Sequence, residues 1–226
     1  MTRIEVLQMI IDRMGAQNYL EIGVGRGHSF LPIKAKRKIA VDPDLRIPAN
    51  RKRSHIFRNL RSKYYALTSD RFFGEVSLPR GLDVVFVDGL HTYEQALKDV
   101  ENALKLLNKN GVIVMHDCNP PNASSALPAA SYSQAASLKL PGWKGEWCGD
   151  AWKSICYLRT QRKDLTVFVL DCDYGLGIVK RGATDDPFEL SEEALRALSY
   201  NDLEKNRQSL LNLKDELFVH EFLKTF

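Results

Sequence analysis

Two acidic residues each follow a short apolar run, and each has a histidine within three positions. Asp88 ends the first run, with His91 three residues later, and His116-Asp117 closes the second run. If the two runs are neighbouring central strands, the carboxylates lie close together and can bind Mg²⁺ through oxygen. Histidine titrates near neutral pH, which suits it to accept the proton of an oxygen nucleophile. These residue types indicate acid–base or metal-assisted chemistry.

A glycine turn supplies the second group of interest. Glu21-x-Gly23-x-Gly25-x-Gly27 overlaps the end of an apolar run. Glycine at alternate positions removes three Cβ atoms from one turn, so a ligand can lie against bare backbone. A strand, a glycine turn and a helix N-terminus form the nucleotide-binding corner of open α/β sheets. The dinucleotide fingerprint needs G-x-G-x-x-G, whereas here the third glycine comes one residue early.

The pattern of the chain predicts the elements that position these groups. Pro32 fits the first turn of a helix that follows the glycine turn and ends in a basic cluster. Strands that alternate with helices predict an α/β fold with a doubly wound, mostly parallel Rossmann-like sheet, one strand near its C-terminal end being antiparallel. The expected strands are 19–22, 38–42, 64–68, 83–88, 112–115, 165–170 and 176–179.

Composition indicates an ordinary globular protein of 226 residues, with 44% hydrophobic and 27% charged residues. We expect one domain over 1–182 and a helical C-terminal extension over 183–226, packed on the same domain or at a dimer surface. No run approaches the ~20 apolar residues of a membrane span, and no signal peptide is recognisable. The four cysteines fit neither a metal motif nor a disulfide framework. A cytoplasmic location follows as the default expectation.

Charge is unevenly distributed along the chain. Residues 1–80 hold 16 Lys and Arg against 7 Asp and Glu, whereas residues 81–226 hold 16 against 21. Most of the excess lies between Lys34 and Lys63. Such a stretch can steer an anionic substrate or a nucleic acid, but a solvated surface of helices is the simpler interpretation.

The ordered set of motifs resembles a known family. Four successive strands end in these motifs: the first in the glycine turn with Glu21, and the next three in Asp42, Asp70 and Asp88. Over roughly residues 15–182, this order resembles class I S-adenosylmethionine-dependent methyltransferases. The runs 87–94 and 111–117 resemble the small-molecule O-methyltransferases with an Asp-Gly-x-His signature.

The resemblance implies S-adenosylmethionine as the cofactor. Gly23, Gly25 and Gly27 are implied to approach its amino-acid part, and Glu21 to contact its amino group or to order the turn. By the same resemblance Asp42 accepts from the ribose hydroxyls, since one carboxylate can take both.

The resemblance also places residues at the adenine end and beside the methyl group. Ser69 and Asp70 are implied to lie at the adenine edge, with Asp70 accepting from the exocyclic amine. Asp88 is implied to lie next to the cofactor at the end of the fourth strand.

Methyl transfer to oxygen needs placement and a base. The nucleophile, the methyl carbon and the sulfur must be held in line, and an alcohol or phenol must lose a proton. His91, with Asp88 beside it, is the candidate general base or substrate anchor. His116, Trp147 and Trp152 are the candidate acceptor-binding residues, although the two indoles could equally form an aromatic core under a loop. The expected acceptor is a small molecule such as a sugar or a secondary metabolite.

Asp88 and Asp117 are also candidate ligands for a divalent metal such as Mg²⁺, which some members of the broader group use. The catechol-type pattern ends its second strand with Asp-Asn, whereas this chain has His116-Asp117-Cys118, so the third ligand is missing at the matching position. His116 can substitute, which would suit a softer metal.

Other functions fit parts of the sequence. A methyltransferase for RNA or another polyanion is favoured by the basic stretch, but the acidic balance after residue 80 and the lack of an appended RNA-binding module weigh against a nucleic-acid partner. The glycine spacing argues against a nicotinamide-dependent dehydrogenase. The retained Asp88, His91 and Asp117 argue against a binding module with a decayed site. No membrane partner is expected, and a homodimer is left open.

Overall fold

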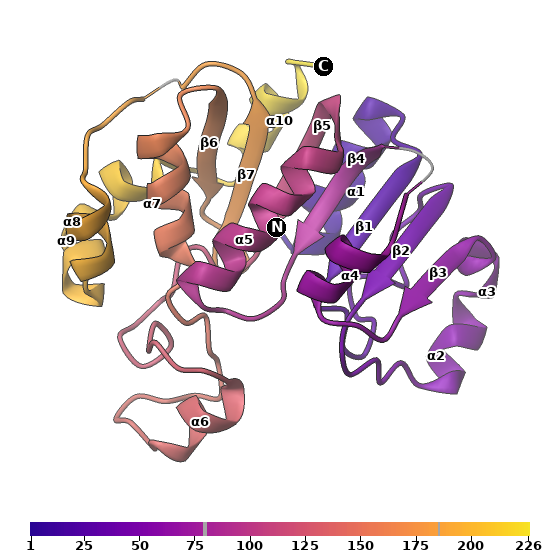
Figure 1. Ribbon diagram of the computed structural model, residues 1–226, viewed down its shortest axis with the longest axis horizontal. Helices are drawn as coiled ribbons and strands as arrows, with labels where there is room; N and C mark the ends of the chain where they lie inside the picture. Colours follow the sequence, from indigo (N-terminus) through magenta and orange to yellow (C-terminus); the bar gives the residue numbers. More distant parts are fainter. Residues whose placement is uncertain (79–80, 185) are drawn as a thin grey trace.

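One eight-stranded sheet organises the described part of this computed structural model, residues 1–78, 81–184 and 186–226 (Figure 1). The strand order is β3-β2-β1-β4-β5-β7-β6-β8. The pairs among β1 to β5 are parallel, β7 is antiparallel to both β5 and β6, and β8 is parallel to β6. The expected fold class is therefore confirmed. The strands are β1 Asn18–Ile22, β2 Arg37–Val41, β3 Ser62–Tyr65, β4 Leu82–Val87, β5 Leu107–Met115, β6 Leu165–Leu170, β7 Leu176–Arg181 and β8 Leu213–Lys214.

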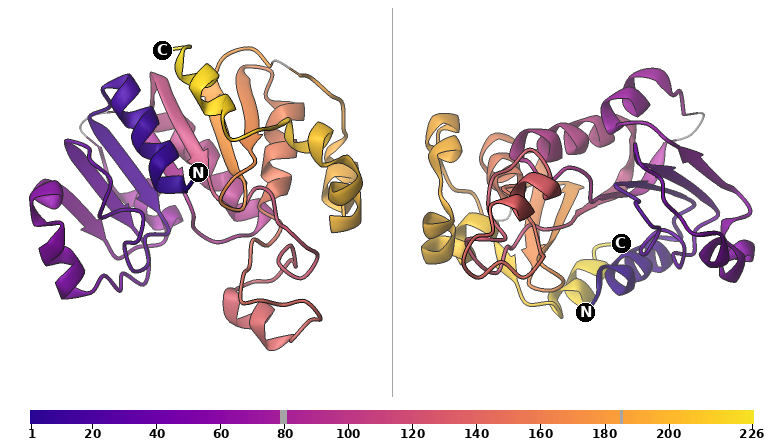
Figure 2. Two further views of the ribbon diagram at one scale, coloured as in Figure 1. Left: turned by 180° about the vertical axis from the view of Figure 1, so that it is seen from behind. Right: turned by 90° about the horizontal axis from the view of Figure 1, so that it is seen from below.

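Helices cover both faces of the sheet. Three of them lie over one face in Figure 1: α4 (Ser69–Glu75), α5 (Tyr93–Leu106) and α7 (Trp152–Gln161). The view from behind in Figure 2 shows α1 (Arg3–Met14) and α10 (Phe218–Leu223) on the other face. The remaining helices are α2 Ala49–Ser54, α3 Ile56–Asn59, α6 Tyr132–Ser137, α8 Glu192–Ala197 and α9 Tyr200–Leu211.

Each face of the sheet has its own apolar core. Successive residues of a strand point to opposite faces. Val85 of β4 therefore packs in the core that contains Leu104 of α5. Its neighbours Val84 and Phe86 lie in the second core with Ile10 of α1. Burial on both sides explains why the β4 sequence is a continuous apolar run.

The helix expected from Pro32 onward is not formed. Residues 25–32 make consecutive turns instead. That expectation was wrong because tertiary partners satisfy the backbone carbonyls of this segment. The buried ammonium group of Lys38 donates to the carbonyl oxygens of Phe30 and Ile33, the latter at 2.8 Å. Burial lowers the pKa of Lys38 to about 7.

Residues 183–226 add to the sheet as well as to its faces. Helices α8 and α9 pack against α7, β8 pairs with the end of β6, and α10 packs against α1. The extension thus packs on the same unit as residues 1–182 and is not entirely helical. A dimer surface on it stays a prediction. Within the described ranges, no helix has both the length and the apolar character to cross a membrane.

Candidate active site

The residues expected to bind the cofactor gather where the parallel strands end. From the neighbouring strands β1 and β4 the chain continues toward opposite edges of the sheet, to β2 and to β5. Ligands of open α/β sheets bind at the point where the strand order reverses in this way. A pocket of about 460 Å³ lies here, lined among others by Gly23, Asp42, Ser69, Asp70 and Asp88. That volume falls in the range of small-molecule sites.

The glycine turn is shaped by one close approach and one open position. Gly23 has φ +87°, and a Cβ there would lie 1.8 Å from the carbonyl oxygen of Asp88. Gly25 has φ +49°, and its Cβ direction meets no atom of the described residues within 4 Å. Its N–H donates to Asp42 Oδ2 at 2.8 Å. Gly27 packs against protein side chains, so it shapes the turn and does not face the pocket.

Glu21 lies inside the protein and does not line the pocket. Its carboxylate oxygens accept hydrogen bonds from the hydroxyls of Ser29 at 2.6 Å and Tyr19 at 2.5 Å. Burial raises the pKa of Glu21 to about 7, although both hydrogen bonds act to lower it. Of the two roles that the sequence implied, this geometry supports ordering of the turn, because Ser29 belongs to the turn segment.

Asp42 keeps its carboxylate at the pocket. Oδ2 accepts from the N–H of Gly25, and Oδ1 accepts from the N–H of Asp44 at 2.6 Å. These bonds fix the side chain but leave a further lone pair on each oxygen. Pro43 lines the same pocket beside it. Asp42 can therefore accept from two ligand hydroxyls without moving.

Ser69 and Asp70 begin α4 and are tied to α5. Gln95 Nε2 donates to Ser69 Oγ at 3.1 Å and to Asp70 Oδ1 at 3.2 Å. A hydrogen bond from Lys98 at 2.6 Å lowers the pKa of Asp70. Sequence reasoning missed Asp99, which accepts from the same Gln95 and whose pKa burial raises to about 6. The sequence did contain a signal for it, because Asp99 is an acidic residue on the otherwise apolar face of α5.

Beyond the pocket, the ends of β4 and β5 bring two histidines and two carboxylates together. His91 Nε2 lies 3.5 Å from Asp88 Oδ1, and His91 Nδ1 lies 3.2 Å from Asp117 Oδ2. His116 Nδ1 lies 3.2 Å from Asp88 Oδ1 and 3.0 Å from Asp117 Oδ2. The predicted proximity of the two carboxylates is thus present in the structure. Asp117 adopts φ +59°, a strained value of the kind that clusters at functional sites.

Neighbouring charges favour the charged forms of Asp88 and of the two histidines. Burial lowers the pKa of His91, but Asp117 and Asp88 outweigh it and raise that pKa to about 9. Burial also lowers the pKa of His116, but Asp88 and Asp117 outweigh it and raise that pKa well above its usual value. Burial raises the pKa of Asp88, yet the two histidines hold it far below its usual range. His91 is therefore a stronger base than free histidine.

Arg3 and Asp173 complete the cluster, and sequence reasoning missed both. Arg3 donates from Nε and Nη2 to Asp173 at 3.0 and 3.1 Å, and from Nη1 to Asp88 at 3.1 Å. His116 Nε2 lies 3.4 Å from Asp173 Oδ1. Asp173 has φ +46° in the β6–β7 turn. No local pattern could pair two residues 170 positions apart.

The segment 118–150 packs against His91. Trp147 stacks on the His91 ring, with centroids 5.2 Å apart, and its carbonyl oxygen lies 2.6 Å from His91 Nδ1. Gly149 has φ +60°, and a Cβ there would lie 1.9 Å from the His91 carbonyl oxygen. Trp152 is only 1% exposed and belongs to the core beneath α5. Trp152 is therefore a core residue, and its side chain is not available for the contact with an acceptor that was expected from the sequence.

The three donors Asp88, His116 and Asp117 fit a metal ion by type and spacing, since their ligand atoms lie within 4.8 Å of one another. If an ion bound here, His116 would take the place of the ligand that this chain lacks relative to the catechol-type pattern. Mixed imidazole and carboxylate donors suit transition metals as well as Mg²⁺. Arg3 already donates to Asp88, so an ion and the guanidinium would compete for that carboxylate.

Comparison with known sequences points to one domain type. Residues 20–118 match the family model of a methyltransferase domain. An uncharacterized protein of Acanthamoeba polyphaga mimivirus is 32% identical over 112 residues, which cover 44% of this chain and 50% of that protein. The chain therefore spans half the length of this relative.

Solved structures share the fold at low sequence identity. The O-methyltransferase TomG of Streptomyces achromogenes, in complex with S-adenosylmethionine, superimposes with a TM-score of 0.55 over 79% of each chain at 15% identity. An O-methyltransferase of Bacillus cereus, in complex with S-adenosylhomocysteine, gives 0.52 over 80% of each chain at 16% identity. Residues 20–118 are thus similar to a methyltransferase domain, and the structural neighbours show that the chain has a Rossmann-like fold. O-methyltransferases stand among the structural neighbours.

Proposed function

We propose that this chain transfers a methyl group from S-adenosylmethionine to an oxygen nucleophile of a small molecule, such as a sugar or a secondary metabolite. The observation that carries the proposal is the place of Asp88. It lines the pocket beside the glycine turn, and its Oδ1 lies 3.5 Å from His91 Nε2. One carboxylate thus joins a pocket suited to a nucleoside with a base suited to a hydroxyl.

The cofactor fits the pocket by the chemistry of its lining. When bound, S-adenosylmethionine supplies an electrophilic methyl group on a sulfonium. The free lone pairs of Asp42 would accept from the ribose hydroxyls, and the open backbone at Gly25 would lie against the amino-acid part. Ser69 and Asp70, held by Gln95, would stand at the adenine end.

In its neutral form, which predominates only above its pKa of about 9, His91 would remove the acceptor's proton through Nε2. A carbonyl oxygen can only accept, so the contact of Nδ1 with Trp147 at 2.6 Å places the hydrogen on Nδ1 and leaves Nε2 as the basic nitrogen. Asp88 and Asp117 would stabilise the imidazolium once it forms, as their effect on the pKa of His91 indicates. The stacked Trp147 ring shields one face of the imidazole from water.

Arg3 would provide a fixed positive charge beside the acceptor. Its two-point hydrogen bond with Asp173 holds the guanidinium plane in one orientation. A divalent ion on Asp88, His116 and Asp117 is the alternative source of charge, and when bound it would lower the pKa of an acceptor oxygen. Removal of metal by EDTA distinguishes between Arg3 and a divalent ion as the source of positive charge. Unchanged turnover in EDTA favours Arg3, and a loss that Mg²⁺ or Mn²⁺ restores favours the ion.

A polyanionic acceptor such as RNA is the second candidate, and the basic stretch 34–63 favours it. The hollows lined by those cations, however, lie where the strands begin, whereas Asp88 and His91 lie where they end. A strand of about six residues spans ~20 Å. The part of a polyanion that is bound in these hollows would therefore lie too far from His91 to be deprotonated by it.

The proposed activity is tested with labelled S-adenosylmethionine, pools of sugars and phenols, and RNA. We expect label in a small hydroxylated molecule. Transfer to RNA alone, or calorimetric binding of NAD but not of S-adenosylhomocysteine, would refute the proposal. In the same assay His91→Gln should reduce kcat by roughly 10²–10⁴-fold with unchanged cofactor affinity. The exposed His220→Gln is the control and should keep full activity.

A further inference from the structure

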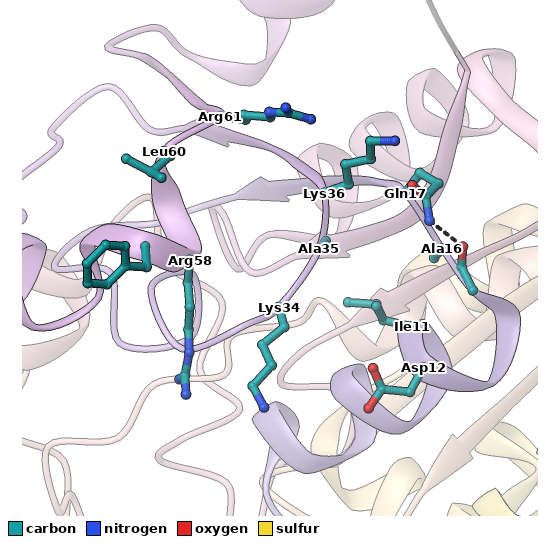
Figure 3. A pocket seen from close by; sticks show the side chains of 12 residues that line it. Ile11, Asp12, Ala16, Gln17, Lys34, Ala35, Lys36, Arg58, Leu60 and Arg61 are labelled. Carbon is teal, nitrogen blue, oxygen red and sulfur yellow. Dashed lines mark hydrogen bonds between the residues drawn. The ribbon is translucent and has the colours of Figure 1, made fainter.

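A basic groove lies at the end of the sheet opposite the active site (Figure 3). It has a volume of about 490 Å³, and its lining comes from the end of α1, the segment before β2, and α3 with the residues that follow it. Ile11 and Ala16 supply apolar lining. The cofactor pocket instead follows the ends of β1, β2 and β4. The groove is therefore separate from the catalytic site.

Positive side chains dominate this groove. Lys34, Lys36, Arg58 and Arg61 line it, and Asp12 is the one carboxylate among its lining residues. All four cationic residues are exposed. Among the described residues, none of the four forms an ion pair with a carboxylate, in contrast to Arg46, Arg71 and Lys98. Their charge is available to an anionic ligand.

Two further hollows adjoin the groove at Leu60, which lines all three. One of about 430 Å³ adds Arg37 and Lys63, and one of about 240 Å³ adds Lys52 and Arg53. Neither has a carboxylate among its described lining residues. The positive charge thus extends over three adjoining hollows and is not confined to one of them.

Exposed apolar side chains stand between these cations. Ile56 is 51% exposed, Phe57 88% and Leu60 70%. All three belong to α3 or to the residue after it. A helix that only faces solvent would carry polar residues at such positions, and clustered exposed apolar groups are typical of a binding surface.

We propose that these three hollows bind a single-stranded nucleic acid, as a docking surface distinct from the methyl-acceptor site. Its phosphates would pair with the lysines and arginines, while bases would pack on Phe57 and Leu60. Cationic grooves with exposed rings are how proteins hold single strands without reading sequence. A flat bilayer cannot enter hollows, so an anionic membrane fits this surface less well. RNA and single-stranded DNA offer the same chemistry here.

The test uses fluorescence anisotropy of the full chain with labelled oligo(U) and oligo(dT) of about 16 nucleotides. Arg58→Ala/Arg61→Ala is the groove variant. Lys105→Ala/Lys109→Ala removes the same charge from another surface and is the matched control. We expect the groove variant to bind at least ~10-fold more weakly, with a salt slope lower by about 1.4, since each phosphate contact to a single strand contributes about 0.7. The control should bind as the parent does.

Phe57→Ala separates stacking from charge. It should weaken binding by roughly 5- to 100-fold and leave the salt slope unchanged. Equal melting temperatures of the variants establish that they are folded. Equal affinity of the variants for S-adenosylhomocysteine keeps this result independent of the proposed methyl transfer. The oligo(U) and oligo(dT) arms show which nucleic acid is preferred.

Three results would overturn the proposal. One is the absence of binding to either oligonucleotide at low salt. Another is an equal loss in the Lys105→Ala/Lys109→Ala control. The third is binding to vesicles of phosphatidylcholine and phosphatidylserine without binding to oligonucleotides.

Discussion

Charges at the candidate acceptor site balance residue by residue. Each carboxylate stands next to a cation and each histidine next to a carboxylate. For Asp88, Asp173 and the two histidines, these neighbours outweigh burial and favour the ionised form. Truncation of one member would leave a partner buried and unpaired, which costs more than the pair itself contributes. The members are Arg3, Asp88, His91, His116, Asp117 and Asp173.

Among the described residues, Glu21 has no cation in hydrogen-bonding range, and its burial gives a pH dependence of stability. Burial raises its pKa from 4.5 to about 7, so the folded protein keeps this proton to higher pH than the unfolded chain. Folding stability should therefore fall as pH rises from about 4.5 to about 7. Glu21→Gln removes the titration and should gain roughly 2–3 kcal/mol relative to the parent between pH 5 and pH 8.

Urea unfolding at the two pH values measures this difference. Glu189→Gln, an exposed site, should show no such gain and is the control. If the Glu21→Gln protein and the parent change in parallel with pH, Glu21 does not hold its proton in the folded state.

Among the elements, the turn after β1 depends most on a distant partner. From the neighbouring strand, the ammonium group of Lys38 donates to three carbonyl oxygens of that segment, those of Phe30, Leu31 and Ile33. Lys38→Met keeps the apolar stem but leaves those carbonyls without their donor, so the free energy of unfolding should fall by about 3 kcal/mol. The exposed Lys36→Met should stay within about 0.5 kcal/mol of the parent. Denaturant titration of both variants measures these free energies of unfolding. A Lys38→Met protein as stable as the parent would mean that other donors bind the carbonyl oxygens.

The elements also show what the sequence could and could not predict. Apolar runs and the acids after them were predictable, because alternation and burial are local properties of a strand. That is why Asp42, Asp88 and Asp117 lie where the pattern indicated. The turn after β1 was predicted as a helix, since its bonds to Lys38 exist only once β2 is in place. The contact of Arg3 with Asp173 joins the first helix to the β6–β7 turn, and no spacing in the sequence encodes it.

On the scale of the whole molecule, the proposed cofactor pocket draws its lining from the ends of β1 and β2, the residues that follow β4, and helices α4 and α5, which pack together only in the folded chain. A ligand that binds this pocket therefore stabilises the whole fold and not one segment. At 100 times its dissociation constant, such a ligand adds about 2.7 kcal/mol. For a chain of this length, that corresponds to a rise in melting temperature of roughly 5–10 °C.

S-adenosylhomocysteine should produce this rise, and NAD at the same concentration should not. Asp42→Asn should lose most of it, because a hydrogen bond to a carboxylate is worth about 1.5–3 kcal/mol. Asp44→Asn changes an exposed aspartate two positions away, whose carboxylate pairs with Arg46, so it should respond as the parent does. Thermal melts of the three proteins with each ligand make the comparison. A full shift in the Asp42→Asn protein would remove the ribose role of Asp42, and a shift with NAD alone would contradict the assignment of the pocket.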